Sequence, residues 1–264
     1  MSRGEPRNIA LKRCEAYVRG YCAVPVRGSR QTPAETAMHK KNPEKTTRIS
    51  VIVPTRNQGT YLGACLDALW FQDYPELEIL LVDNASTDNT PEVATALQHA
   101  VNQEKVSYAS YYDEQTNAIE RVWHARYPAH GRTFAAHRLE QPVDFARAVQ
   151  YGLAKATGAL HCVLRANVLC YPQLLSTLAK PLLNGEADTT FADAFLCDAQ
   201  GRILRELPAH DTTTFALNGP ASLPAPGPDD APPALFLRKA HTTNTIDPTR
   251  QQHVPMTLCV VRIE

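Results

Sequence analysis

Two short polar segments carry the side chains in this sequence that are best suited to bind a ligand. The first is Pro54-Thr55-Arg56-Asn57, and the second is Asp83-Asn84-Ala85-Ser86-Thr87-Asp88. Together they offer hydroxyl, amide and carboxylate groups, and the guanidinium of Arg56 can stack on a flat ring or pair with a phosphate. Each segment directly follows an apolar run, so its position depends on how the two runs pair.

The two apolar runs, Ile49–Val53 and Leu77–Val82, predict buried β-strands. Leucines and a cysteine recur at helical spacing between them, and the segment from Gln72 to Pro75 ends that helix. A connection that contains a helix forces the two strands to lie parallel, with a right-handed crossover. Because ligands bind outside the carboxyl ends of the strands in open α/β sheets, we expect both polar segments to line one site.

Later parts of the chain predict further strands and helices around this unit. Apolar runs predict strands at 133–139, 160–164 and 189–196, a turn at 198–202 that leads into a strand at 203–207, and a last strand within 256–263. Helical periodicity predicts helices at about 90–101, at 144–157 with Gly158 at the C-terminal cap, and at 174–183. We also predict a helical insertion at about 105–130, because Ile119, Val122 and Trp123 recur at helical spacing.

The sequence divides into an N-terminal extension and one α/β domain. Residues 1–47 predict a short helix followed by a proline-containing linker, and residues 48–264 form the domain. Within the domain, about 218–233 is rich in proline, alanine and glycine and predicts an irregular loop. A length of 264 residues suits one such domain with appendages.

Composition excludes several classes of function. Lysine plus arginine and aspartate plus glutamate are equal at 27 each, so no net field favours nucleic acid or an anionic membrane. No apolar run approaches the roughly 20 residues of a spanning helix, and the N-terminus lacks the apolar core of a signal peptide. We therefore expect no integral membrane segment and a cytoplasmic protein. Seven cysteines without a Cys-x-x-Cys pair predict buried thiols in a reducing compartment.

The order of several segments resembles the opening of family 2 glycosyltransferases with the GT-A fold. Val-Ile-Val-Pro-Thr-Arg-Asn is followed by a Leu-x-x-Leu helix, by Gln-Asp-Tyr-Pro and by Glu-Ile-Leu-Leu-Val-Asp-Asn-Ala-Ser-Thr-Asp-Asn-Thr. The resemblance is strong from about Arg48 to Glu92 and can be followed to Pro172. It implies a three-layer α/β/α sandwich with a mostly parallel central sheet, and transfer of a sugar from a nucleotide-sugar donor.

The resemblance also implies roles for individual residues. Pro54, Thr55, Asn57 and Asp83 take the places that hold the base and ribose of the nucleotide. Arg56 stands where the family often has a tyrosine, and it offers a guanidinium in place of the ring. The nucleotide-sugar-binding residues that we predict are Pro54, Thr55, Arg56, Asn57, Asp83, Ser86, Arg165 and Asn167.

The sequence departs from the family at the Asp-x-Asp motif that binds a divalent cation, Mn²⁺ or Mg²⁺. The corresponding residues are Arg165-Ala166-Asn167, so we predict that the cation ligands are lost. Either Arg165 supplies the positive charge and binds the diphosphate directly, or the site has decayed.

The acidic motif that supplies the family's catalytic base is also missing after the strand near Leu235, which leaves the catalytic residues unassigned. The acids that could be recruited are Asp193, Asp198, Asp211, Asp229 and Asp230. Two functions therefore stay open. One is a glycosyltransferase with a glycan, lipid or protein acceptor. The other is a catalytically inactive GT-A domain that binds a nucleotide or a partner protein.

Overall fold

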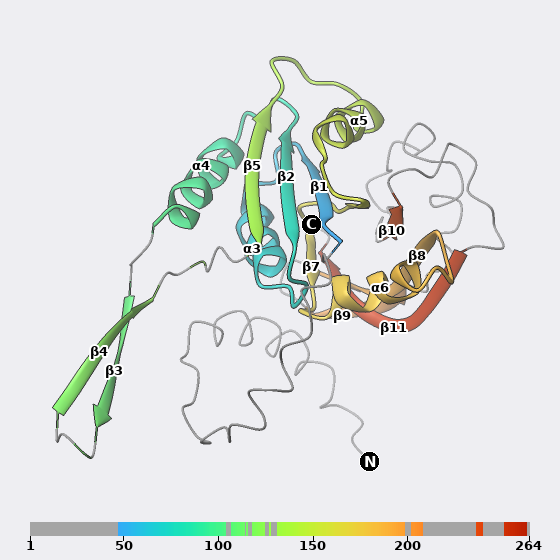
Figure 1. Ribbon diagram of the computed structural model, residues 1–264. Helices are drawn as coiled ribbons and strands as arrows, with labels where there is room; N and C mark the ends of the chain where they lie inside the picture. Colours follow the sequence, from blue (N-terminus) through green and yellow to red (C-terminus); the bar gives the residue numbers. More distant parts are fainter. Residues whose placement is uncertain are drawn as a thin grey trace, which may run out of the picture.

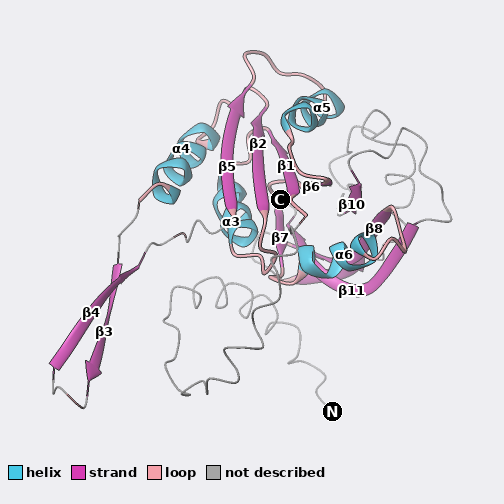
Figure 2. Ribbon diagram, in the orientation of Figure 1, coloured by secondary structure: helices cyan, strands magenta, loops and turns pink. Residues whose placement is uncertain are grey.

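A computed structural model of the chain describes residues 47–103, 107–113, 115, 118–124, 127, 131–198, 202–207, 236–239 and 251–262. The predicted N-terminal helix and linker and the predicted irregular loop lie outside these residues. The described part is built around one large sheet with helices on both faces, and a separate two-stranded sheet projects from it (Figures 1 and 2).

The first strand, helix and second strand form the predicted parallel unit. These elements are β1 (Ile49–Thr55), α3 (Gly59–Trp70) and β2 (Leu77–Asp83). β1 and β2 pair in parallel from Ile49 with Leu77 to Thr55 with Asp83. Every residue of both strands is buried, which explains why the two runs are apolar throughout rather than alternating.

Seven further strands join this pair in the nine-stranded main sheet. Its order is β5-β2-β1-β6-β10-β8-β11-β7, and β9 pairs with β8 off this path. The added strands are β5 (Arg132–Arg138), β6 (Leu160–Val163), β7 (Val168–Cys170), β8 (Thr189–Cys197), β9 (Ile203–Leu207), β10 (Phe236–Lys239) and β11 (Gln251–Arg262). β5, β2, β1 and β6 are mutually parallel, and β8 is parallel to β11, so the predicted mostly parallel α/β/α sheet is confirmed.

Helices cover the two faces of the sheet with separate apolar clusters. α3, α4 (Thr90–Val101) and α6 (Leu174–Leu183) pack on one face, in a cluster that includes Val51, Val53 and Leu81. α5 (Phe145–Lys155) packs on the other face, in a cluster that includes Ile52 and Val163. Figure 1 shows α5 on its own side of the strands. Successive residues of a strand point to opposite faces, so these clusters define which face each site residue belongs to.

α5 ends earlier than expected, and Gly158 has a different role from the predicted cap. The helix stops at Lys155, and Ala156 is already extended. Gly158 instead packs against β1, where an added Cβ would lie 2.7 Å from the carbonyl oxygen of Arg48. Its N–H donates to Ser50 Oγ at 2.8 Å, and Ser50 donates to the buried carboxylate of Glu78. Close backbone approach, rather than helix capping, therefore requires glycine here.

The predicted helical insertion at about 105–130 is wrong. This segment contains an antiparallel hairpin, β3 (Ser107–Asp113) and β4 (Ala118–His124), with Tyr112 opposite Ile119. β-branched and aromatic residues favour a strand, and three apolar residues within five positions fit a helix and a strand alike, so cross-strand pairing decides. The hairpin projects away from the main sheet in Figure 1.

Tyr127 and Gly131 fix the return of the chain from the hairpin to the sheet. Tyr127 is buried against the rings of Trp70 and Phe71, and its hydroxyl donates to Asp67 Oδ1 at 2.7 Å. Gly131 has a φ of +65°, and an added Cβ would lie 2.2 Å from the carbonyl oxygen of Pro75. Both contacts hold the start of β5 against the C-terminal end of α3.

Candidate functional site

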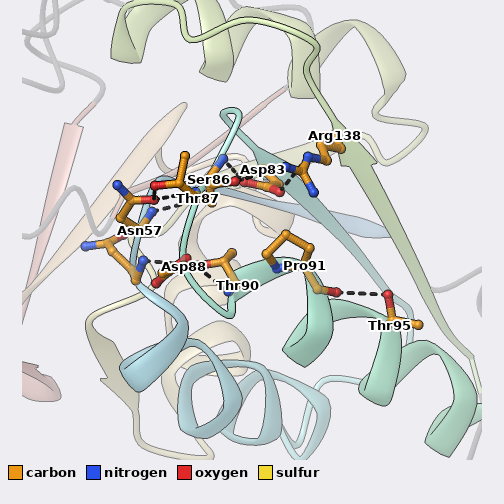
Figure 3. A network of polar contacts seen from close by, with 10 residues as sticks. Asn57, Asp83, Ser86, Thr87, Asp88, Thr90, Pro91, Thr95 and Arg138 are labelled. Atoms are coloured by element: carbon orange, nitrogen blue, oxygen red, sulfur yellow. Dashed lines mark hydrogen bonds and ion pairs between the residues drawn. The ribbon is translucent and has the colours of Figure 1, made fainter.

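The two predicted polar segments meet at the carboxyl edge of the sheet. Thr55 and Asp83 are paired residues at the ends of β1 and β2, so the segments that follow them run side by side. The N–H of Asn57 donates to Ser86 Oγ at 3.0 Å, and the N–H of Thr87 donates to Asn57 Oδ1 at 2.8 Å (Figure 3). The prediction that the two segments lie side by side at this edge is confirmed.

One residue in each segment adopts a left-handed backbone conformation. Asn57 has a φ of 53°, and Ala85 has a φ of 52°. Asparagine tolerates this region, whereas alanine adopts it at a cost of about 1–2 kcal/mol. Backbone strain of this kind is concentrated at ligand sites, where the surrounding hydrogen bonds enforce it.

Asp83 carries a buried oxygen that the described residues do not satisfy. The residue is 3% exposed, and its Oδ1 accepts a hydrogen bond from the N–H of Ser86 at 2.9 Å. Its Oδ2 is also buried and has no hydrogen-bond partner among the described residues, and it forms a long ion pair with Arg138 Nε at 3.7 Å. A buried acceptor without a donor is costly, which makes Oδ2 the candidate position for a ligand's N–H or O–H group.

Arg138 belongs to the same site and was not among the predicted residues. It ends β5, where it is paired with Asp83, and its Nη2 donates to the carbonyl oxygen of Ser86 at 2.9 Å. Its side chain is 58% exposed, so most of the guanidinium is accessible. The sequence could have indicated Arg138, because it lies near the end of the predicted strand at 133–139. That strand lies parallel to β2, so its carboxyl end lies at the same edge of the sheet.

Asp88 ties the beginning of α4 to the beginning of α3. Its carboxylate accepts hydrogen bonds from the N–H groups of Gly59 and Thr90, each at 3.0 Å. Burial opposes the charged form, but the hydrogen bonds from Thr90 and Gly59 outweigh it and hold the pKa of Asp88 below its usual value. An added Cβ at Gly59 would lie 2.1 Å from Asn89 Oδ1, so the junction is closed to larger residues. Both loops are therefore fixed before any ligand binds.

The remaining predicted residues of this edge differ in exposure. Pro54 and Thr55 are buried, whereas Arg56 and Asn57 are exposed. Thr55 Oγ1 donates to Gln58 Oε1 at 3.4 Å. Arg56 thus presents its guanidinium to solvent beside a site whose buried acceptor is Asp83.

Comparisons with known proteins match this same unit. The family described as glycosyl transferase family 2 matches residues 50–110. Glycosyltransferase GlyG of Streptococcus pneumoniae serotype 4 is 43% identical over 58 residues, which are 22% of this chain and 19% of GlyG. The uncharacterized glycosyltransferase YibD of Escherichia coli is 27% identical over 177 residues, which are 66% of this chain and 42% of YibD.

A solved structure, residues 1–349 of S. aureus TarS in complex with UDP, superposes with a TM-score of 0.52. Its sequence identity is 16%, and the match covers 82% of this chain and 61% of that one. This chain is a family 2 glycosyltransferase-like protein with a GT-A fold. It spans less than half the length of the two curated relatives. Among the described residues, no helix is long and apolar enough to cross a membrane.

The residues that we predicted to stand at the family's Asp-x-Asp motif lie just beyond the end of β6. Arg165 and Asn167 lie in the turn between β6 and β7, and both are half-buried. The guanidinium carbon of Arg165 lies 5.2 Å from the ring centroid of Phe145, and burial lowers the pKa of Arg165. Within the described ranges, no group of three or more His, Cys, Asp or Glu side chains is arranged to hold a metal ion. One amide and one fixed positive charge do not fit a divalent cation.

Of the five candidate acids, Asp193 and Asp198 fall within the described residues. Asp198 caps the turn into β9, where its carboxylate accepts hydrogen bonds from the N–H and Nε of Arg202. Asp193 Oδ1 lies 2.9 Å from His253 Nε2, and the imidazole stacks on Phe191 with centroids 5.5 Å apart. His253 was not among the predicted residues, because no pattern in the sequence links β8 to β11.

Proposed function

We propose that this protein transfers a sugar from a nucleotide-sugar donor to an acceptor. The observation that carries the proposal is the buried Oδ2 of Asp83, which lacks a hydrogen-bond partner among the described residues and lies between two fixed loops. A nucleobase N–H and the ribose hydroxyls are donors of the kind that this oxygen lacks. TarS, with which this chain shares its fold, has been crystallised with UDP and with UDP-GlcNAc.

The roles proposed for the edge follow from exposure and hydrogen bonding. Asp83 accepts a hydrogen bond from the nucleoside, and Ser86 and Asn57 keep the two loops in place around it. Pro54 and Thr55 form the buried wall beneath the nucleoside. The exposed guanidinium of Arg56 stacks on the base or pairs with a phosphate, as planar guanidinium groups do. Arg165 and Asn167, at the end of β6, face the diphosphate. The acceptor is a hydroxyl group on a glycan, lipid or protein.

A second candidate function is a catalytically inactive domain that binds a nucleotide or a partner protein. The loss of both acids at Arg165-Ala166-Asn167 favours it, because the departing diphosphate needs its charge neutralised. Turnover and binding separate the two candidates.

The test is hydrolysis of a panel of UDP- and GDP-sugars together with nucleotide binding. We expect slow turnover of at least one donor, and we expect Asp83→Asn to abolish turnover and to weaken uridine or guanosine at least 10-fold, since a buried acceptor is replaced in part by a donor. Asp73→Asn is the matched control, because Asp73 is exposed near the end of α3, at the opposite edge of the sheet. Binding without turnover across the panel supports the inactive domain. Failure of every nucleotide to bind contradicts both.

The thiols fit a reducing compartment, and we propose that the protein acts in the cytoplasm. Cys65 and Cys162 are buried thiols of the core. Burial raises the pKa of Cys65 and of Cys162 to about 12, so neither forms a thiolate at neutral pH. Fractionation of the source cells with an antibody against the chain tests the location.

A further inference from the structure

Arg165 lies at the same edge of the sheet as Asp83, just beyond the end of β6. Ile52 of β1 pairs with Val163 of β6, so Arg165 is level with Pro54. Val163 belongs to the apolar cluster under α5, and alternation places Arg165 on that face too. A cation held at this point would face a guanidinium, which repels it.

Arg165 is a half-buried charge without a carboxylate partner among the described residues. Its guanidinium makes a cation–π contact with the ring of Phe145. The closest acid on α5, Asp144, is engaged elsewhere, because it caps the helix through the N–H of Arg147 and lies 3.3 Å from Arg147 Nε. A desolvated guanidinium without a counterion is costly, which points to an anionic ligand.

We propose that Arg165 binds the diphosphate of the nucleotide directly and replaces the divalent cation used elsewhere in the family. This inference rests on the proposed function and deepens it. The ring of Phe145 holds the guanidinium plane, so that its N–H groups remain available to two phosphate oxygens. The positive charge is then part of the chain and is present before the nucleotide binds.

The experiment is calorimetric titration of UDP, GDP and the bare nucleosides, with Mn²⁺, with Mg²⁺ and with a chelator. We expect the same diphosphate affinity in all three conditions. Arg165→Ala should weaken the diphosphate about 10- to 100-fold and the nucleoside less than about twofold, because only the phosphates contact the guanidinium. Arg147→Ala is the matched control, since Arg147 is an exposed arginine on α5, the helix that carries Phe145.

Three outcomes separate the explanations. A requirement for Mn²⁺ or Mg²⁺, or a silent Arg165→Ala, overturns the role of Arg165 while nucleoside binding by the wild type preserves the nucleotide site. Absence of any nucleotide binding by the wild type contradicts the proposed function itself, and the role of Arg165 with it. Circular dichroism of each variant shows whether a loss of affinity reflects unfolding.

A separate observation concerns strands β8 and β11, on the face of the sheet that α5 covers. Asp193 and His253 form a hydrogen-bonded pair on the neighbouring strands β8 and β11, and His253 remains 41% exposed. Cys162 of β6 and Thr190 of β8 both pair with Leu237 of β10, which lies between these two strands. Arg165 and Asp193 each follow three positions later, so they lie at the same level of the sheet, two strands apart. Adjacent strands are about 4.8 Å apart, so the two residues are separated by about 10 Å along the sheet.

Asp193 also faces the same side of the sheet as Arg165. Phe191 packs in the cluster under α5 with Val163, and Asp193 follows it by two positions on β8. Phe191 in turn carries the stacked ring of His253. An acceptor hydroxyl near the anomeric carbon of a donor held by Arg165 would therefore lie on the side of the His253 imidazole.

We infer that His253 is the general base of the transfer and that Asp193 is a positioning residue. Nε2–H of His253 donates to Asp193, which leaves Nδ1 to take the proton of the acceptor hydroxyl. As that proton leaves, the acceptor oxygen bonds to the anomeric carbon. The bond from this carbon to the diphosphate oxygen breaks, and its electron pair leaves with the nucleoside diphosphate. Asp193 stabilises the imidazolium that forms.

Donor hydrolysis tests the base, because water can replace the acceptor. We expect His253→Gln to lower turnover about 10²- to 10⁴-fold and to leave UDP affinity within about twofold. Asp193→Asn should lower turnover less, and added imidazole should restore turnover to His253→Ala. His99→Gln on α4 is the control, since His99 is exposed and distant from β11. Unchanged turnover in His253→Gln overturns the role of His253, whereas absence of turnover in the wild type contradicts the proposed function.

Discussion

The two halves of the sheet edge hold their polar groups in different ways. In the half built from β5, β2 and β1, hydrogen bonds between loops fix Asn57 and Ser86, and Asp83 lies beneath them. In the half built from β6, β8 and β11, aromatic rings hold the polar side chains: Arg165 lies over Phe145, and His253 stacks on Phe191.

This difference explains which half follows the family. The loop contacts join residues within one strand–helix–strand unit, about thirty positions apart, and the family match at 50–110 covers that unit. One ring contact, between Phe191 and His253, joins β8 to β11 across about sixty positions, and the other holds Arg165, which lies outside the family match. The first half is therefore the part of the edge that the family match covers, whereas Arg165, Asp193 and His253 lie outside that match.

The largest effect is expected from a substitution that removes hydrogen bonds in the half built from β5, β2 and β1. Asn84 is buried, and its side chain donates to the carbonyl oxygen of Val143 at 2.7 Å and accepts from the N–H of Val143 at 2.8 Å. Asn84→Ala removes both bonds and should lower the free energy of unfolding by about 2 kcal/mol. Urea denaturation measures this, and Asn184→Ala, at an exposed asparagine after α6, should change it by less than about half as much.

Equal loss in both variants would show that the loop beyond β2 is not tied to the segment before α5. The contrast between the halves would then rest on the Asn57 and Ser86 contacts alone.

Much of the half built from β5, β2 and β1 could be predicted from the sequence. Ile49–Val53 and Leu77–Val82 are fully buried strands, and a helix-containing connection makes them parallel, so the meeting of Thr55 and Asp83 follows from local pattern. Arg138 was not predicted as a site residue, because its strand was expected to run to Leu139, which places Arg138 inside the strand rather than at its end. The left-handed conformation of Ala85 could not be predicted, because alanine, unlike glycine or asparagine, does not favour that conformation.

The hairpin and the second half could not be predicted in the same way. Ile119, Val122 and Trp123 fit a helix by spacing, and only the pairing of β4 with β3 makes them a strand. The partnership of Asp193 with His253 depends on the parallel pairing of β8 with β11 across about sixty positions. Register between strands so far apart is set by tertiary packing, which a single sequence does not record.

A smaller effect is expected from the ring that holds Arg165. Phe145→Leu keeps an apolar side chain at the start of α5 but removes the cation–π contact. We expect UDP affinity to fall about two- to fivefold, as for the loss of a partly exposed cation–π pair, while uridine affinity stays the same. Calorimetry with both ligands measures the ratio. Phe71→Leu is the control, because Phe71 stacks on Tyr127 at the other edge of the sheet. A parallel fall for uridine would mean that Phe145 supports the fold rather than the guanidinium.

The smallest effect is expected at acid pH from the carboxylate that joins the two loops. The pKa of Asp88 is lower in the folded chain than its unperturbed value of 3.8, so the charged carboxylate stabilises the fold above that pH. This stabilisation is lost as the pH falls below 3.8 and through the folded pKa, because protonation removes the charge that accepts the N–H groups of Gly59 and Thr90. Asp88→Asn should therefore lower the thermal midpoint slightly at pH 7 and flatten its dependence on pH below 4. Thermal scans from pH 7 to pH 3 measure both curves, and Asp73→Asn serves as the exposed control. Curves that stay parallel down to pH 3 would show that hydrogen bonds among the backbone groups, rather than this carboxylate, fix the nucleotide half of the edge.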